Sequence, residues 1–361
     1  MPPPSAREVE WRPAAEETRL RVKKLICLSG VMLASVAAAG PAQAAPAAVT
    51  LSGAGSTLVA PLIAEWASQY HIFFGDRISY EAVGSPAGIS ALSSGAVDFG
   101  ATDSPLTSAQ RQSCSHCLQI PWALTAIAIG YHVASIRGKL DLSGRVLAGI
   151  YLGQITKWDD PRIKALNPRL RLPSLHIAPV YTNDSGDTYN FTGYLDRVSR
   201  AWRSKVGQGE TVSFPAGISA HSSSGATALL ESTNGAITFV GAAYLIRHRL
   251  PAAAIQNAAG HYEYPNLTNV KSAGASVVRV PAGNAIQIVD PPKSAKAAYP
   301  ISAFSYVVVS RDGNSGHKPA LKDWLTYATG LAQSYGQNLD FARLPPVVLR
   351  AARATVRTWS G

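Results

Sequence analysis

The chain has 361 residues, a formal net charge of +11 and 47% hydrophobic residues. This hydrophobic content can supply real cores and the length suits about two domains, so a disordered chain is excluded. The basic residues are scattered and form no run or aromatic-interleaved stripe, which argues against a nucleic acid as a partner.

The N-terminal 44 residues have the pattern of a signal peptide. Basic residues at 19–24 precede an apolar stretch at 25–39, and Ala42-Gln43-Ala44 supplies the small residues of a cleavage site. The apolar stretch is short for a membrane-spanning helix. We therefore expect residues 1–44 to be a signal peptide with an extended N-terminus, cleavage after Ala44, and a periplasmic or otherwise exported protein. The polar character of the first residues favours a translation start nearer Val22.

Strands and helices alternate from residue 49 onward. Residues 49–52 are predicted as a strand, the segment from Ser56 as a helix with apolar residues at helical spacing, and 77–82 as an alternating strand. A short helix at 89–93 then leads to an acidic turn at Val97–Asp103.

Only two cysteines follow the signal peptide, in the motif Cys114-Ser-His-Cys117. An oxidising compartment would pair them, so we expect a local disulfide that pins a loop. A redox centre would place this motif at the start of a helix, whereas here it leads into an apolar strand. A zinc site would need two ligands besides the cysteines, and His116 alone does not supply them.

The second half of the chain continues the alternation. Its predicted elements are an apolar segment at 120–132, a helix at 147–152, a strand at 176–180, a helix with Phe191, Tyr194, Leu195 and Val198 on one face, strands at 235–240 and 303–310, and a helix at 321–335. The polar, proline-rich stretch Pro281–Pro292 is the expected return crossing between two lobes. This order predicts an α/β fold that binds its ligand at the carboxyl ends of strands.

Three serine- or threonine-glycine segments each precede a predicted helix: Gly53–Thr57, Val83–Gly88 and Asp184–Thr188. Glycine lets the backbone approach a ligand, free N–H groups at a helix start point at an anion, and hydroxyls add neutral donors. Three such segments in one chain predict a site for a small, phosphate-like oxyanion.

Several longer motifs resemble those of one family. They are GAGSTLVAPLIAEWASQY, VGSPAGI, GAVDFGATDSPLT, IPWALTAIAIGYHV, LAGIYLGQITKWDDPRIKALNP, DSGDTYNFTGYL and NGAITFVGAAYL. In this order and spacing, over residues 50–350, the chain resembles the phosphate-specific substrate-binding proteins of bacterial ABC importers, the PstS family.

The resemblance implies a two-lobed periplasmic-binding-protein fold of type II, with a mixed sheet in each lobe and a hinge and ligand cleft between them. It implies lobe I from residues 45–124 and 292–361 and lobe II from 125–291, with crossings near Leu124 and Asp290. It further implies a monomer that is not an enzyme, needs no cofactor, and delivers inorganic phosphate to a membrane permease.

The resemblance also implies ligand contacts. Thr57 and the Leu58 N–H group carry over from the first segment. Ser85, which precedes Pro86, is predicted as a helix N-cap that faces the anion. Asp103 would accept a hydrogen bond from protonated phosphate and reject sulphate, which has no proton to donate. Asp98 is interpreted as structural.

The third segment departs from the family pattern. The family has an arginine shortly before this segment, and residues 181–188 contain none. Ser185, Gly186 and Thr188 remain predicted donors. Asp187 either adds a second carboxylate to the site or caps the helix and points away. If it faces the ligand, singly charged dihydrogen phosphate becomes the better fit and affinity falls as pH rises.

Other candidate functional residues are supported by weaker sequence signals. His221 precedes Ser222-Ser223-Ser224, but no nucleophile elbow is present, so we expect these residues at the rim of the cleft. Trp158 is interpreted as a core anchor and Asp159 or Asp160 as a helix cap. No metal motif is present. Two alternatives stay open: a secreted phosphatase or hydrolase, and a paralogue that binds another oxyanion or acts as a sensor because the arginine is missing.

Overall fold

The computed structural model describes residues 48–312 and 316–359. The predicted signal peptide, with its cleavage point after Ala44, lies outside these residues. Among the helices of the described ranges, none has both the length and the apolar character that crossing a bilayer would require.

A mixed eight-stranded sheet has the order β2-β1-β3-β11-β4-β8-β6-β7. Its strands are β1 (Thr50–Gly55), β2 (Arg77–Glu81), β3 (Phe99–Thr102), β4 (Cys117–His132), β6 (Ala178–Thr182), β7 (Ile218–Ala220), β8 (Ala236–Gly241) and β11 (Ser302–Ser310). A small three-stranded sheet contains β5 (Asp141–Leu142), β9 (Ala254–Gln256) and β10 (Tyr262–Glu263).

Helices surround the sheet. They are α2 (Ala60–Phe74), α3 (Ser85–Ser93), α4 (Ser108–Ser113), α5 (Gly144–Tyr151), α6 (Pro161–Leu166), α7 (Gly186–Val198), α8 (Arg200–Lys205), α9 (Ser223–Ser232), α10 (Ala242–His248), α11 (Leu267–Ala275), α12 (Lys318–Ala328) and α13 (Pro346–Thr358). Three short 3₁₀ helices are η1 (Ala282–Asn284), η2 (Leu331–Ser334) and η3 (Gln337–Leu339).

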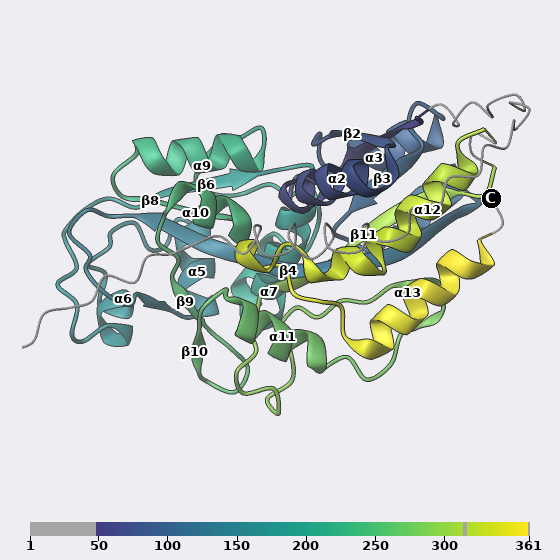
Figure 1. The fold of residues 1–361 in the computed structure, drawn as a ribbon. Helices are drawn as coiled ribbons and strands as arrows, with labels where there is room; N and C mark the ends of the chain where they lie inside the picture. The colour runs from purple at the N-terminus through teal and green to yellow at the C-terminus, as the bar shows by residue number, and fades with distance from the viewer. Residues whose placement is uncertain (1–47, 313–315, 360–361) are drawn as a thin grey trace, which may run out of the picture. The chain divides into compact units, whose positions relative to one another are not determined.

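Strand β4 joins the two halves of the sheet. Residues 117–126 pair with β11, and residues 127–132 pair with β8. In Figure 1, α2, α3 and α12 lie at one end of this long strand, and α6 and α9 lie at the other. All but the first two and the last residue of β4 are buried, which is what a strand covered on both faces requires.

Each half has an aromatic core. In the first half, Trp66, Trp122 and Trp324 pack edge to face, with ring centroids 5.7–6.5 Å apart. In the second half, Phe191 stacks on Phe239 with their ring centroids 4.1 Å apart. These arrangements match the preferred geometries of aromatic pairs, so each half of the sheet is anchored separately.

Three sequence predictions are confirmed by the geometry. Trp158 is fully buried, and its Nε1–H donates to the carbonyl oxygen of Gly235 at 3.0 Å. Asp160 caps α6 and accepts a hydrogen bond from the Arg162 N–H. Cys114 and Cys117 form the expected disulfide, between the end of α4 and the start of β4.

The structure corrects the start of two predicted helices. The first begins at Ala60 and not at Ser56, because the Ser56 N–H still bonds to the Ala101 carbonyl beside β1. The second begins at Ser85 and not at residue 89, with Gly84 as the N-cap, so Ser85 lies inside the helix.

Two other predicted segments are also corrected. The acidic turn at Val97–Asp103 contains strand β3, whose four buried residues lie beside β1 and β11. The predicted helix at 321–335 spans Lys318–Ala328 and stops there, because Gly330 adopts a ψ of −109° that a helix does not allow. Tyr335 is therefore outside any helix.

The contact between α3 and β1 yields a stability prediction. A Cβ atom on Gly88 would lie 2.3 Å from the Gly55 Cα, whereas a Cβ on Gly225 of α9 would meet only ordinary contacts. We expect Gly88→Ala to lower the free energy of unfolding by about 2 kcal/mol, because the helix must move off the strand. Gly225→Ala, the control, should be neutral or stabilising. Urea denaturation measures both, and equal stabilities would contradict the prediction.

Candidate functional site

The three predicted serine- and threonine-glycine segments meet in the structure. Gly84, in the second segment, lies against the third, since a Cβ there would be 2.5 Å from the Asp184 carbonyl oxygen. A Cβ on Gly186 would lie 2.9 Å from Ser85 Oγ and 2.6 Å from Asp103 Cβ. Only glycine permits these approaches, so the starts of α3 and α7 face each other across a very short gap.

The first segment contacts the start of α9 through Thr57. Its hydroxyl lies 2.7 Å from the hydroxyl of Ser223, at the start of α9. Tyr244 donates to the Thr57 carbonyl oxygen at 2.9 Å and fixes the backbone there. Leu58 is fully buried in the core and packs under Gly241.

Asp103 follows β3 and is 2% exposed. Its Oδ2 accepts a hydrogen bond of 2.5 Å from Ser56 Oγ, while its Oδ1 is buried without a partner. Burial first, and then the nearby Asp187 carboxylate, together raise the pKa of this carboxyl to about 7, although the hydrogen bond from Ser56 lowers the pKa.

Asp187 lies in the first turn of α7 and is 1% exposed. Ser185 is the cap of this helix, because its side chain accepts from the Asp187 N–H group. The Asp187 carboxylate instead accepts from Ser223 Oγ at 2.9 Å, and its Oδ1 is buried without a partner. Burial raises its pKa to about 6. Ser185, and not Asp187, is therefore the cap of this helix.

Two other residues of α7 have fixed roles. The Thr188 hydroxyl donates to the Thr182 carbonyl oxygen, so its proton is committed to the backbone. Asn190 donates from Nδ2 to the carbonyl oxygens of Asp103 and Gly186, each at 2.8 Å. Asn190 thus ties the start of α7 to the residue that carries the first carboxylate.

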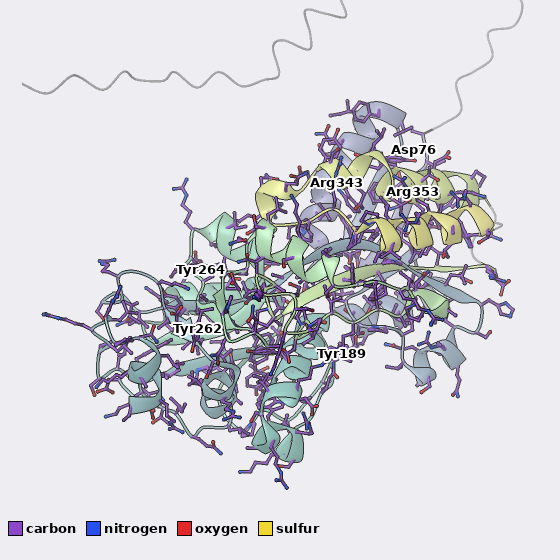
Figure 2. All side chains as sticks on the ribbon, turned by 90° about the horizontal axis from the view of Figure 1, so that it is seen from below. Asp76, Tyr189, Tyr262, Tyr264, Arg343 and Arg353 are labelled. Carbon is purple, nitrogen blue, oxygen red and sulfur yellow. A yellow bond between two sulfur atoms is a disulfide. The ribbon has the colours of Figure 1, made fainter. Side chains whose placement is uncertain are left out.

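Basic side chains are missing from this cluster. In the ranges that the structure describes, no lysine or arginine bonds to Asp103 or Asp187. Figure 2 shows Arg343 and Arg353 among the C-terminal helices, away from Tyr189 on α7, and both donate from Nε to backbone carbonyl oxygens nearby. Asp98 is also separate, because it accepts from Ser52 and lies 2.8 Å from His317.

A pocket of about 190 Å³ opens beside Thr57. Gly84, Ser185, His221 and Ser223 are among its lining residues. The sequence analysis placed Ser223 only at the rim, whereas the structure makes it the link between Thr57 and Asp187. The Ser-Ser-Ser-Gly start of α9, a fourth segment of the same kind, was the available signal. Asn190 had no comparable signal in the sequence.

The arrangement suits a small anion that carries protons. Starts of helices and hydroxyls supply donors to an anion, while two unpartnered carboxylate oxygens supply acceptors. An anion without hydrogens has no donor to offer such acceptor oxygens, which costs binding free energy.

Comparisons with known proteins relate this chain to phosphate-binding proteins. A family model described as a PBP superfamily domain matches residues 40–330. The phosphate-binding protein PstS of Xylella fastidiosa (strain 9a5c) is 31% identical over 309 residues, covering 85% of this chain and 84% of that protein. PstS of Haemophilus influenzae is 30% identical over 316 residues, covering 86% of this chain and 93% of that protein.

Solved structures share the fold. A high-affinity periplasmic phosphate-binding protein, PfluDING, bound with phosphate, matches with a TM-score of 0.68 and 21% identity over 85% of this chain and 93% of its own. An ABC-type phosphate transport receptor from Vibrio cholerae matches with a TM-score of 0.53 and 19% identity over 82% of this chain and all of its own.

The raised pKa of Asp103 makes stability depend on pH. Its ordinary pKa is 3.8, so between about pH 4 and 7 the folded state binds more protons than the unfolded state, and stability falls as pH rises through that interval. We expect Asp103→Asn to stabilise the ligand-free protein at pH 8, by on the order of 3 kcal/mol, and much less at pH 4.5. Urea denaturation at both pH values measures this. The exposed Asp323→Asn is the control, and a pH-independent difference would contradict the prediction.

Proposed function

Because the chain belongs to the PstS family of phosphate-binding proteins, we propose that it captures inorganic phosphate outside the cytoplasm and delivers it to the membrane permease of an ABC importer. The observation that carries this proposal is the meeting of the α3 and α7 starts around Asp103. Backbone N–H groups and hydroxyls there can bond to phosphate oxygens, and Asp103 can accept the phosphate proton.

The proposed ligand contacts are Thr57, Leu58, Ser85, Asp103, Ser185, Gly186, Asp187 and Thr188. Of these, Thr188 would contribute its backbone, because its hydroxyl already donates to Thr182. Asp187 would act through Ser223. Discrimination against sulphate would come from Asp103, whose unpartnered Oδ1 needs a donor that sulphate lacks.

We propose that the two halves of the sheet act as lobes, with lobe I from residues 45–124 and 292–361 and lobe II from 125–291. In support, β4 exchanges its partner from β11 to β8 between residues 126 and 127. The bond between Thr57 and Ser223 joins the two proposed lobes. A hinge motion that opens the cleft would break that bond.

The protein is proposed to be an exported monomer without catalytic activity. The phosphatase alternative is not favoured, because the relatives that match most of the chain are phosphate-binding proteins. His221 is exposed and lines the pocket, and within the described ranges it makes no hydrogen bond to a serine hydroxyl. The family relationship likewise gives no support to a paralogue that has given up phosphate.

Isothermal titration of residues 45–361, stripped of ligand by unfolding and refolding, tests the function. We expect phosphate to bind at pH 6 and sulphate to give no heat. Gly186→Ala should weaken phosphate binding by about tenfold or more, because its Cβ would displace Asp103 and cost at least one hydrogen bond to a charged group.

Gly225→Ala on the same background is the matched control, with thermal melts to verify that both variants fold. Absence of phosphate heat in the parent would refute the function, and an unaltered affinity of Gly186→Ala would refute the site. Turnover of a chromogenic phosphate ester by the parent, lost in one serine variant, would favour an enzyme instead.

A further inference from the structure

We propose that the site takes up one extra proton with each phosphate dianion, and that a hydroxyl chain from Asp187 through Ser223 to Thr57 sets this requirement. The inference rests on the proposed phosphate-binding function and concerns the form of phosphate that is held. It depends on the direction of hydrogen bonds in the chain, which follows from how many protons each group owns.

The hydroxyl chain is continuous and buried. Ser223 Oγ lies 2.9 Å from Asp187 Oδ2 and 2.7 Å from Thr57 Oγ1, and all three residues are buried. Each hydroxyl has one proton to donate and two lone pairs with which to accept. The donor direction along the chain is therefore decided by the group at its end, which is Asp187.

When Asp187 is ionised, the hydroxyls of the chain donate toward Asp187 and away from the ligand, a direction called inward below. A carboxylate can only accept, so Ser223 donates its proton to Asp187, and Thr57 donates its proton to Ser223. Thr57 Oγ1 then offers only lone pairs to the ligand. A phosphate oxygen that bonds to it must bring a hydrogen, as dihydrogen phosphate does.

When Asp187 is protonated, the hydroxyls of the chain donate away from Asp187 and toward the ligand, a direction called outward below. It donates to Ser223, Ser223 donates to Thr57, and the Thr57 proton becomes available to a bare phosphate oxygen. Both arrangements contain the same number of protons. Compared with the ionised protein plus the phosphate dianion, each arrangement has gained one proton. In the first arrangement this proton is on the ligand, and in the second it is on Asp187.

Asp103 can accept a hydrogen bond from the one hydrogen that the phosphate dianion carries. Ser56 already donates to its Oδ2, and the buried Oδ1 has no partner, so it can accept a proton carried by phosphate. The phosphate dianion has one hydrogen, which satisfies Asp103 and leaves none for an inward-pointing Thr57. The second carboxylate is thus the feature that calls for a further proton.

Other titratable groups near the cluster do not supply the missing charge. Burial raises the pKa of Tyr80 and Tyr306, and that of Tyr244 to about 12, so these tyrosines stay neutral. Glu210 bonds to Ser104 and adds negative charge. Arg247 donates to the Pro61 carbonyl oxygen. The pocket itself is lined by Asp184 and His221, so His221 is the group whose own protonation must be tested separately.

The pKa values of Asp187 and Asp103 lie in a pH range in which binding can be measured. Burial raises the pKa of Asp187 to about 6 and that of Asp103 to about 7, so both are ionised in the free protein at pH 8.5. Uptake of one proton per phosphate then lowers affinity about tenfold for each pH unit.

Titration calorimetry with phosphate at pH 6.5, 7.5 and 8.5, in two buffers of different ionisation enthalpy, counts the protons taken up. The parent should take up about one proton at pH 8.5 and lose affinity about tenfold per unit above pH 7.5. Asp187→Asn is the informative variant, because the amide Nδ2 donates permanently and holds the chain outward. It should bind at pH 8.5 about tenfold more tightly than the parent, with proton uptake near zero.

Two further variants separate the causes. Ser223→Ala removes the middle of the chain, so it should reduce proton uptake although Asp187 remains. His221→Gln should leave both the uptake and the pH slope unchanged. The exposed Ser232→Ala, at the far end of α9, is the matched control and should behave as the parent does.

The outcomes distinguish the inference from the function. Phosphate binding with no proton uptake and a flat profile would overturn the inference and leave the proposed function standing. A pH slope abolished by His221→Gln, or an Asp187→Asn variant that folds but binds no better at pH 8.5, would also overturn it. No phosphate binding by the parent at any pH would refute the proposed function itself.

Discussion

The site depends on two buried carboxylates, Asp103 and Asp187, to which no basic side chain of the described residues is bonded. Removing a carboxylate from water is costly, and Asp187 adds repulsion to Asp103. The surrounding hydroxyls of Ser56 and Ser223 offset part of this cost, and the rest appears as raised pKa values. The same groups that make the ligand-free site unfavourable make it selective, because only a partner that donates hydrogens relieves them.

Much of the fold could be predicted from the sequence. Buried strands such as β4 and β8 are continuous apolar runs, and the helices α2 and α7 carry apolar residues at helical spacing. Boundaries were predicted less well where tertiary contacts decide them. Ser56 stays with the sheet because it bonds to Ala101, a contact 45 residues away that local propensity does not contain.

The site was predictable in its parts and not in its connections. Glycine-serine segments, Asp103 and the missing arginine can all be recognised along the chain. The orientation of Asp187 cannot, because aspartate is equally suited to capping a helix, and it was Ser185 that took that role. Ser223 lies 166 residues from Thr57 in sequence, so their contact follows only from the folded sheet, which brings α9 beside the first segment.

The aromatic cores have a practical consequence for optical measurements. The six tryptophans of the described residues are at most 1% exposed, so their fluorescence reports on the core and is shielded from events in the cleft. A reporter must therefore be attached from outside. Val83 is 51% exposed and adjoins Gly84 at the pocket, and the two cysteines that follow residue 44 are joined to each other. A cysteine introduced at Val83 would be the single free thiol of residues 45–361, available to an environment-sensitive dye for following ligand capture in real time.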